Sequence, residues 1–191
     1  MFITGAAKGL GRAFSIAYAQ AGASYIILGT RTDASDVKAA VLKAAAAAGR
    51  ATPTVINVII DVTNQASVDA AAAEIRAQVG RLDILVNNAG YMAPEGNLFD
   101  LNSEEYLRTL DVNLTGTYRV TKALLPLMLE GGDKTVVSVT SVGAHSVECQ
   151  ASYSISKFAV CRFAQFMAEE YADSVSPPSL HVHACVVELI D

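Results

Sequence analysis

Short apolar runs alternate with alanine-rich, helix-forming stretches along the whole 191-residue chain. The runs lack the polar alternation of a half-exposed strand, so we expect strands that are buried on both faces of a sheet. The stretches between them have the length of the crossover helices that parallel strands require. The expected strands are 2–4, 25–28, 55–60, 82–86, 136–139 and 181–187, and the expected helices are 9–21, 35–48, 65–79, 103–128 and 151–172. This order predicts a doubly wound α/β fold with three layers, α/β/α, around a parallel sheet.

Residues at the helix ends support two of the expected helices. Gly22 follows the first helix and is suited to a left-handed C-terminal cap. Ser103 followed by Glu104 and Glu105 favours a helix start. Pro126 should end or kink that same helix near its C-terminal end.

Composition and charge exclude several classes of function. Apolar residues make up 52% of the chain, charged residues 17%, and the formal net charge is −5. A core is therefore expected, whereas a basic nucleic-acid footprint is not. No apolar run reaches the ~18 residues of a membrane span, and the chain opens without a basic, hydrophobic secretion signal. We therefore expect a cytoplasmic protein with no nucleic-acid or membrane partner.

Cysteine and histidine are too sparse for a metal site. Cys149, Cys161 and Cys185 show no pattern of a disulfide framework or a metal cluster, so we expect thiols in a reducing compartment. His181 and His183 would face the same side of a strand, but no third ligand follows from the spacing. We expect no metal.

A glycine-rich segment joins the first expected strand to the first helix. It contains Gly5, Lys8, Gly9, Leu10 and Gly11. Glycines permit positive φ and let a pyrophosphate approach the backbone, while the helix start offers free N–H groups and the positive end of the helix dipole. The segment predicts dinucleotide binding, and a plain structural turn is the alternative.

Tyr153 and Lys157 are four residues apart, which places them on one face of a helix. A phenol has a pKa of ~10, and a nearby ammonium favours the phenolate. With its pKa lowered in this way, Tyr153 could act as a general acid in carbonyl reduction and as a base in alcohol oxidation. Ser141 follows the fifth strand and could stabilise charge on a substrate oxygen, or it could simply cap a turn. An ordinary pair on a helix surface is the alternative for Tyr153 and Lys157.

The spacing of Thr4-Gly5 with Gly9 and Gly11 resembles the TGxxxGxG loop of the short-chain dehydrogenase/reductase family. Later segments resemble the family in the same order: Asp61-Val62, Asn87 to Gly90, Asn113, Ser141, and Tyr153 with Lys157. The resemblance implies a Rossmann-type sheet, an NAD(P) cofactor and hydride transfer between a small-molecule carbonyl compound and its alcohol.

The resemblance also implies roles for single residues. The catalytic set would be Tyr153, Lys157, Ser141 and Asn113, the last holding a water that links Lys157 to solvent. A bend of the helix backbone is the alternative role of Asn113.

The remaining implied roles concern the cofactor. Asp61 would contact the adenine and Val62 would pack beside it, while Asn88 and Gly90 would line the ribose side. Loop capping is the alternative for Asn88. Lys157 would also hold the ribose, and Lys122 is a further cofactor-side candidate or an exposed cation.

The second expected strand is followed by Arg31, with no carboxylate before Asp33. A carboxylate there would bind the ribose hydroxyls and repel a 2′-phosphate. Arg31 and Lys8 could instead pair with that phosphate, so NADP(H) is favoured over NAD(H). Two solvated surface cations are the alternative.

The chain departs from the family after the sixth strand. Val187-Glu188 stands where the family has a proline–glycine pair, and the family's substrate lid and final strand are missing. We expect one domain over 1–191, truncated at its C-terminus. It could be an active reductase with an open site, a cofactor-binding pseudoenzyme, or an incomplete gene product. The family forms oligomers through the helices that here are 103–128 and 151–172, so a homo-oligomer is expected.

Overall fold

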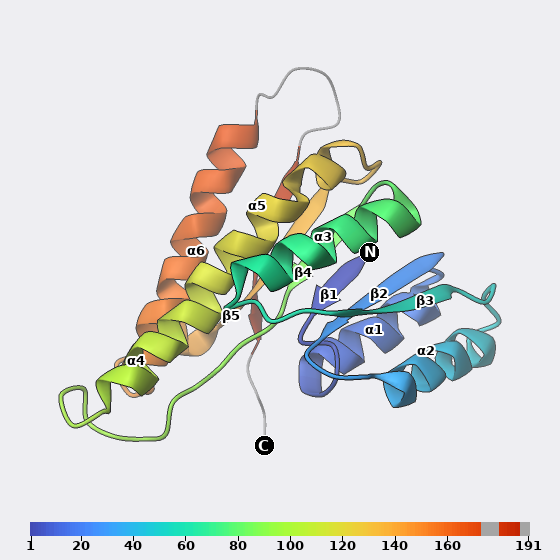
Figure 1. The fold of residues 1–191 in the computed structure, drawn as a ribbon. Helices are drawn as coiled ribbons and strands as arrows, with labels where there is room; N and C mark the ends of the chain where they lie inside the picture. The colour runs from blue at the N-terminus through green and yellow to red at the C-terminus, as the bar shows by residue number, and fades with distance from the viewer. Residues whose placement is uncertain (173–179, 188–191) are drawn as a thin grey trace.

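The computed structural model describes residues 1–172 and 180–187 (Figure 1). Within these residues, six parallel strands form one sheet in the order β3-β2-β1-β4-β5-β6. The strands are β1 (Phe2–Thr4), β2 (Tyr25–Thr30), β3 (Thr54–Ile59), β4 (Ile84–Asn87), β5 (Thr135–Ser141) and β6 (His181–Val187). This order confirms the expected doubly wound, Rossmann-type sheet.

Helices cover both faces of the sheet, as the three-layer prediction requires. The helices are α1 (Gly9–Ala21), α2 (Ser35–Ala47), α3 (Gln65–Val79), α4 (Ser103–Leu110), α5 (Gly116–Leu129) and α6 (Ala151–Ala172). Helices α1 and α2 pack on one face, while α3, α5 and α6 pack on the other (Figure 1).

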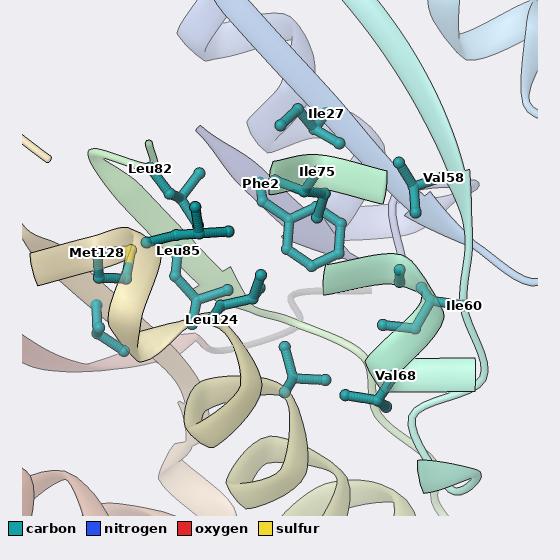
Figure 2. Packing of buried hydrophobic residues seen from close by; sticks show 14 of the residues in the cluster. Phe2, Ile27, Val58, Ile60, Val68, Ile75, Leu82, Leu85, Leu124 and Met128 are labelled. Atoms are coloured by element: carbon teal, nitrogen blue, oxygen red, sulfur yellow. The ribbon is translucent and has the colours of Figure 1, made fainter. Parts of the chain in front are cut away.

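The two faces of each central strand enter two separate cores. Phe2 and Ile27 pack with α3 and α5 in the first core (Figure 2). Ile3 and Leu28, one residue further along each strand, pack with α1 and α2 in the second core. All four side chains are at most 1% exposed, which is why these strands lack polar alternation.

The expected single helix over 103–128 is wrong. A π-helical turn, η1 (Asp111–Thr115), interrupts it between α4 and α5, and the Gly116 N–H donates to the Asp111 carbonyl five residues earlier. Pro126 does not end the helix, because α5 continues to Leu129. Pro126 has no N–H to donate to the Lys122 carbonyl, four residues earlier. Both residues are exposed, so water can satisfy that carbonyl.

Other predictions at element ends need small changes. Strand β2 extends to Thr30 and β5 to Ser141, so both reach further toward the carboxyl edge than expected. Gly22 caps α1 with φ 94°, as predicted. The prediction for Val187-Glu188 cannot be followed, because Glu188 lies outside the described residues.

The described residues form neither a membrane-spanning helix nor a metal cluster. No helix over 1–172 is long and apolar enough to cross a membrane. Within the same described part of the chain, no cluster of His, Cys, Asp and Glu side chains has the arrangement of a metal site.

Candidate active site

A large cleft lies at the carboxyl edge of the sheet. The strand order reverses between β1 and β4, which is where ligands bind in open α/β sheets. The cleft has a volume of about 1890 Å³, above the ~300–1,000 Å³ of ordinary small-ligand pockets. It therefore has room for a dinucleotide together with a substrate.

The glycine-rich segment forms the loop between β1 and α1. Gly5 and Gly9 have φ of +67° and +52°, a conformation that L side chains rarely adopt. Lys8 and Leu10 line the cleft together with these glycines. No side chain caps the N-terminus of α1, so its first N–H groups have no side-chain acceptor at the cap position.

Gly11 has a different role from the other two glycines. It does not line the cleft but lies behind the loop. A Cβ at this position would stand 2.3 Å from the Gly5 carbonyl oxygen and 2.6 Å from the Asn88 amide nitrogen. Only glycine lets the start of α1 pack this closely against the loop.

Asn88 ties the loop after β4 to the loop after β1. Its side-chain Nδ2 donates to the carbonyl oxygens of Thr4 at 2.8 Å and Gly5 at 3.3 Å. The backbone N–H groups of Asn88 and Ala89 both donate to the Thr4 hydroxyl at 3.0 Å. Asn88 therefore caps the loop and also lines the cleft. The role of Thr4 was missed from the sequence, although it is the last residue of the strand before the glycines.

Arg31, Asp61 and Val62 line the cleft beyond the glycine loop. The Asp61 carboxylate accepts from the Thr63 N–H at 2.9 Å and from the Thr63 hydroxyl at 2.7 Å. These bonds, and to a lesser degree the Arg31 and Arg119 guanidinium groups, lower the pKa of Asp61. Asp61 is therefore ionised at neutral pH.

Lys122 is not brought to this site. It is exposed on α5, and its Nζ lies 5.7 Å from the centre of the Tyr118 ring. Of the two expectations for this residue, the exposed cation agrees with its position, since it does not line the cleft.

At the other end of the cleft, α6 carries Tyr153 and Lys157 on one face. Lys157 is only 4% exposed, and its Nζ donates to the Val139 carbonyl at 2.8 Å. Burial lowers the pKa of Lys157 from 10.5 to about 8. The Lys157 Nζ lies 5.6 Å from the centre of the Tyr153 ring, so the ammonium is close to the phenol.

The expectation of a lowered Tyr153 pKa is wrong for the protein by itself. Burial raises the pKa of Tyr153 above its ordinary value of 10, and a hydrogen bond with the Ser141 side chain lowers it by less. The loss of water around the phenol therefore outweighs the favourable contact, because burial penalises the phenolate.

Ser141 caps a turn, which is one of the two roles that the sequence left open, and it also lies in the cleft. It is the last residue of β5, and its hydroxyl oxygen accepts the Gly143 N–H at 3.1 Å, so it caps a turn. The same side chain lines the cleft and hydrogen-bonds Tyr153.

Asn113 lies in the π-helical turn and is 1% exposed. Its Oδ1 accepts the Tyr91 N–H at 2.7 Å, while its Nδ2 donates to the Tyr91 carbonyl at 2.8 Å and to the Ser156 hydroxyl at 2.9 Å. Asn113 therefore holds the backbone of Tyr91, the residue after Gly90. Gly90 itself lies close to Lys157, because a Cβ on Gly90 would stand 3.8 Å from the Lys157 Nζ. The contact of Ser156 with Asn113 was not predicted from the sequence. The one signal for it is a polar residue at a helix position that is buried.

Comparison with known proteins gives consistent matches. The family model described as short chain dehydrogenase matches residues 1–184. The chain is 44% identical over 191 residues to "Short chain dehydrogenase mpl6" of Monascus purpureus, covering 99% of this chain and 65% of that protein. It is 34% identical over 172 residues to "D-threitol dehydrogenase" of Mycolicibacterium smegmatis, covering 88% of this chain and 63% of that protein. The chain thus spans about two thirds of the length of these relatives, 65% and 63%.

Solved structures match as well. Levodione reductase superposes with a TM-score of 0.81 at 29% identity, over 90% of this chain and 65% of that one. A structure described as a putative short chain dehydrogenase from Pseudomonas syringae gives a TM-score of 0.80 at 31% identity, over 92% of this chain and 70% of that one.

Proposed function

Because the chain belongs to the short-chain dehydrogenase/reductase family, we propose that it moves a hydride between a nicotinamide dinucleotide and a small carbonyl compound or alcohol. The observation that carries this proposal is one cleft lined both by Gly5 and Gly9 and by Tyr153, Lys157 and Ser141. A bound nicotinamide dinucleotide would supply or accept the hydride.

The residues at the glycine loop fit the phosphates of such a cofactor. Positive φ at Gly5 and Gly9 turns the backbone sharply, and Gly11 allows α1 to begin immediately behind the turn. Free N–H groups at a helix start bind phosphate oxygens, and the helix dipole favours their negative charge. We assign Gly5, Lys8, Gly9 and Leu10 to the pyrophosphate, with Gly11 as the residue that permits the packing.

Tyr153 is the acid and base in this proposal. In reduction its phenol donates a proton to the carbonyl oxygen, and in oxidation its phenolate takes the proton from the alcohol. Lys157 stabilises the phenolate that forms, since with a pKa of about 8 it is mostly charged at neutral pH. Ser141 donates to the same oxygen, and Asn113 fixes the neighbouring backbone of Tyr91.

We propose NADP(H) as the preferred cofactor, with NAD(H) as the alternative. Arg31 and Lys8 are exposed cations that line the cleft, where a 2′-phosphate could pair with them. Asp33, the first carboxylate after β2, accepts the Ser35 N–H at 3.1 Å and so is engaged at the start of α2.

We also propose a homo-oligomer through α5 and α6. Tyr118 on α5 is 46% exposed, and Phe158 and Phe166 on α6 are each 55% exposed. Apolar side chains on two adjacent helices are suited to burial against a second copy. Sedimentation velocity tests this, and a monomer at micromolar concentration would contradict it.

The test of the proposed reaction is Tyr153→Phe. The purified protein is assayed for oxidation of NADPH with a panel of ketones and aldehydes. Tyr25→Phe is the matched control, since Tyr25 is exposed at the start of β2 and does not line the cleft. Loss of the general acid should lower kcat by roughly a thousandfold, within the usual ~10²–10⁴ range, while the dissociation constant of NADPH changes less than about twofold.

Two outcomes would contradict this proposal. A Tyr153→Phe protein that keeps most of its rate would remove Tyr153 from the mechanism. A wild-type protein that binds NADPH but reduces none of the panel would favour the cofactor-binding pseudoenzyme over the reductase.

A further inference from the structure

The turn after β3 carries Asp61 and Val62, the two residues for which the family resemblance implies contacts with the adenine. Several contacts hold this turn from the side of β2 and α3: the Ile60 N–H donates to the Thr30 carbonyl at 2.7 Å, and the Asp61 N–H donates to the Ser67 hydroxyl at 2.9 Å. The Thr63 bonds to Asp61 lie within the turn itself. None of these bonds is made by Val62 itself, so its position relative to the cleft depends on further contacts.

Arg119 of α5 also contacts the turn. Its Nη1 donates to the Asp111 carboxylate at 2.8 Å and to the Val62 carbonyl at 3.4 Å. Its side chain is 21% exposed, and it does not line the cleft. Arg119 is thus placed behind the turn, where it connects the turn to the first residue of the π-helical segment.

Gly116 supports the same turn from the same helix. A Cβ on Gly116 would stand 2.8 Å from the Val62 Cγ2, so the Val62 side chain packs directly on the helix backbone. Gly116 and Arg119 are three residues apart and share a helix face. The helix therefore fixes Val62 twice, at its side chain through Gly116 and at its carbonyl through Arg119.

The charge of Arg119 acts on the neighbouring residue as well. Together with Arg31 it helps to keep the pKa of Asp61 low, after the larger effect of the Thr63 hydrogen bonds. The guanidinium thus favours the ionised carboxylate at the position proposed for the adenine contact.

We propose that Arg119 is a positioning residue for the adenosine end of the cofactor. It holds the Asp61–Val62 turn against α5 and so sets the width of the adenine site without touching the ligand. This inference rests on the proposed function, because it takes the cofactor to be an adenine dinucleotide.

The experiment compares Arg119→Gln, Arg119→Lys and the wild type. Isothermal titration gives the dissociation constants of NADPH and of ADP, which carries the adenosine and two phosphates but no nicotinamide. Steady-state kinetics give KM for NADPH and kcat. Arg162→Gln is the matched control, since Arg162 lies on α6 with its Nη1 3.0 Å from Gln165.

For Arg119→Gln we expect ADP and NADPH to bind about tenfold more weakly, which corresponds to about 1.4 kcal/mol. KM for NADPH should rise by the same factor, with kcat at saturation changed less than about twofold. Arg119→Lys should lose about threefold, because an ammonium keeps the charge that pairs with Asp111, but the shorter side chain reaches less far toward the Val62 carbonyl. The control should bind as the wild type does.

A general structural role would lower kcat and thermal stability together and would not be rescued by lysine. Unchanged ADP binding in Arg119→Gln, or a loss for NADPH with none for ADP, would overturn the inference. If Arg119→Gln fails to fold, Arg119→Lys decides, and wild-type ADP affinity in that variant overturns it. A wild-type protein that binds neither compound would overturn the proposed function, and this inference with it.

Discussion

The phosphate-loop end of the cleft and the Tyr153 end differ in what fixes their geometry. At the phosphate-loop end the backbone does so: two glycines have positive φ, and Gly11 leaves no space for a Cβ. At the Tyr153 end, ionisable and polar side chains are taken out of water, with Lys157 at 4% and Asn113 at 1% exposure. The first end therefore depends on steric fit, and the second on the energetic cost of burying charge.

This difference decides how each end responds to change. A steric constraint fails abruptly, since backbone atoms in contact cannot move apart without shifting the loop. A desolvated charge responds to pH, because its burial cost disappears when the group loses its proton. Substitutions at the two ends should therefore be distinguishable by their pH dependence.

The largest effect is expected for Gly11→Ala. The new Cβ would stand 2.3 Å from the Gly5 carbonyl oxygen, so we expect a loss of about 3 kcal/mol in the free energy of unfolding and at least a hundredfold weaker NADPH binding. Urea unfolding and fluorescence titration measure the two quantities. Gly49→Ala is the matched control, because Gly49 has φ +65°, lies outside the cleft lining, and a Cβ there meets nothing within 4 Å, so only the strain of positive φ remains, at about 1 kcal/mol. A loss of stability in Gly11→Ala no larger than in the control, with NADPH binding unchanged, would show that close packing at Gly11 does not limit this end.

An intermediate effect is expected for Lys157→Met. Burial lowers the pKa of Lys157 in the folded protein to about 8, below its ordinary value of 10.5. The unfolded chain therefore binds the proton more tightly, and the stability of the wild type should rise with pH between about 8 and 10.5. From pH 7.5 to 9.5 the rise should be about 2 kcal/mol larger in the wild type than in Lys157→Met, as measured by urea unfolding. Parallel pH profiles would mean that the buried ammonium carries no such cost.

The smallest effect is expected for Arg31→Asp, which changes an exposed side chain at the phosphate-loop end of the cleft. If Arg31 pairs with a 2′-phosphate, the ratio of NADPH to NADH affinity should fall by about tenfold in Arg31→Asp. This change comes from the lost charge pair, so it does not require any shift of the glycine loop. Fluorescence titration of both cofactors measures this ratio, with Arg76→Asp as a control on α3 outside the cleft lining. An unchanged ratio would remove Arg31 from cofactor selection and leave NAD(H) equally well supported.

The phosphate-loop end of the cleft could be predicted well from the sequence. Strand-to-helix order and glycine spacing encode it locally, and the bounds of α1, α3 and α6 agree with the expected ones. The Tyr153 end of the cleft was predicted only in part. The side chains of Tyr153, Lys157 and Ser141 do come together, but the raised pKa of Tyr153 depends on burial by segments distant in sequence. The Arg119–Asp111 pair was missed for a similar reason, because its eight-residue spacing is regular only once the π-helical turn is known.

That π-helical turn also affects which insertions and deletions this segment can accept during evolution. Asp111–Thr115 holds one residue more than an α-helical turn would. A one-codon deletion there would leave a continuous α-helix with ordinary hydrogen bonds and nearly the same orientation of α4 relative to α5, because the wide turn absorbs the extra residue. A one-codon deletion within α4 would instead rotate the two flanking parts of that helix by about 100°. It would separate Glu105, which accepts the Tyr91 hydroxyl, from Arg108, whose guanidinium carbon lies 4.2 Å from the Tyr91 ring centre, so that the two could not both contact Tyr91. Insertions and deletions of one residue should therefore be tolerated more readily within Asp111–Thr115 than within α4.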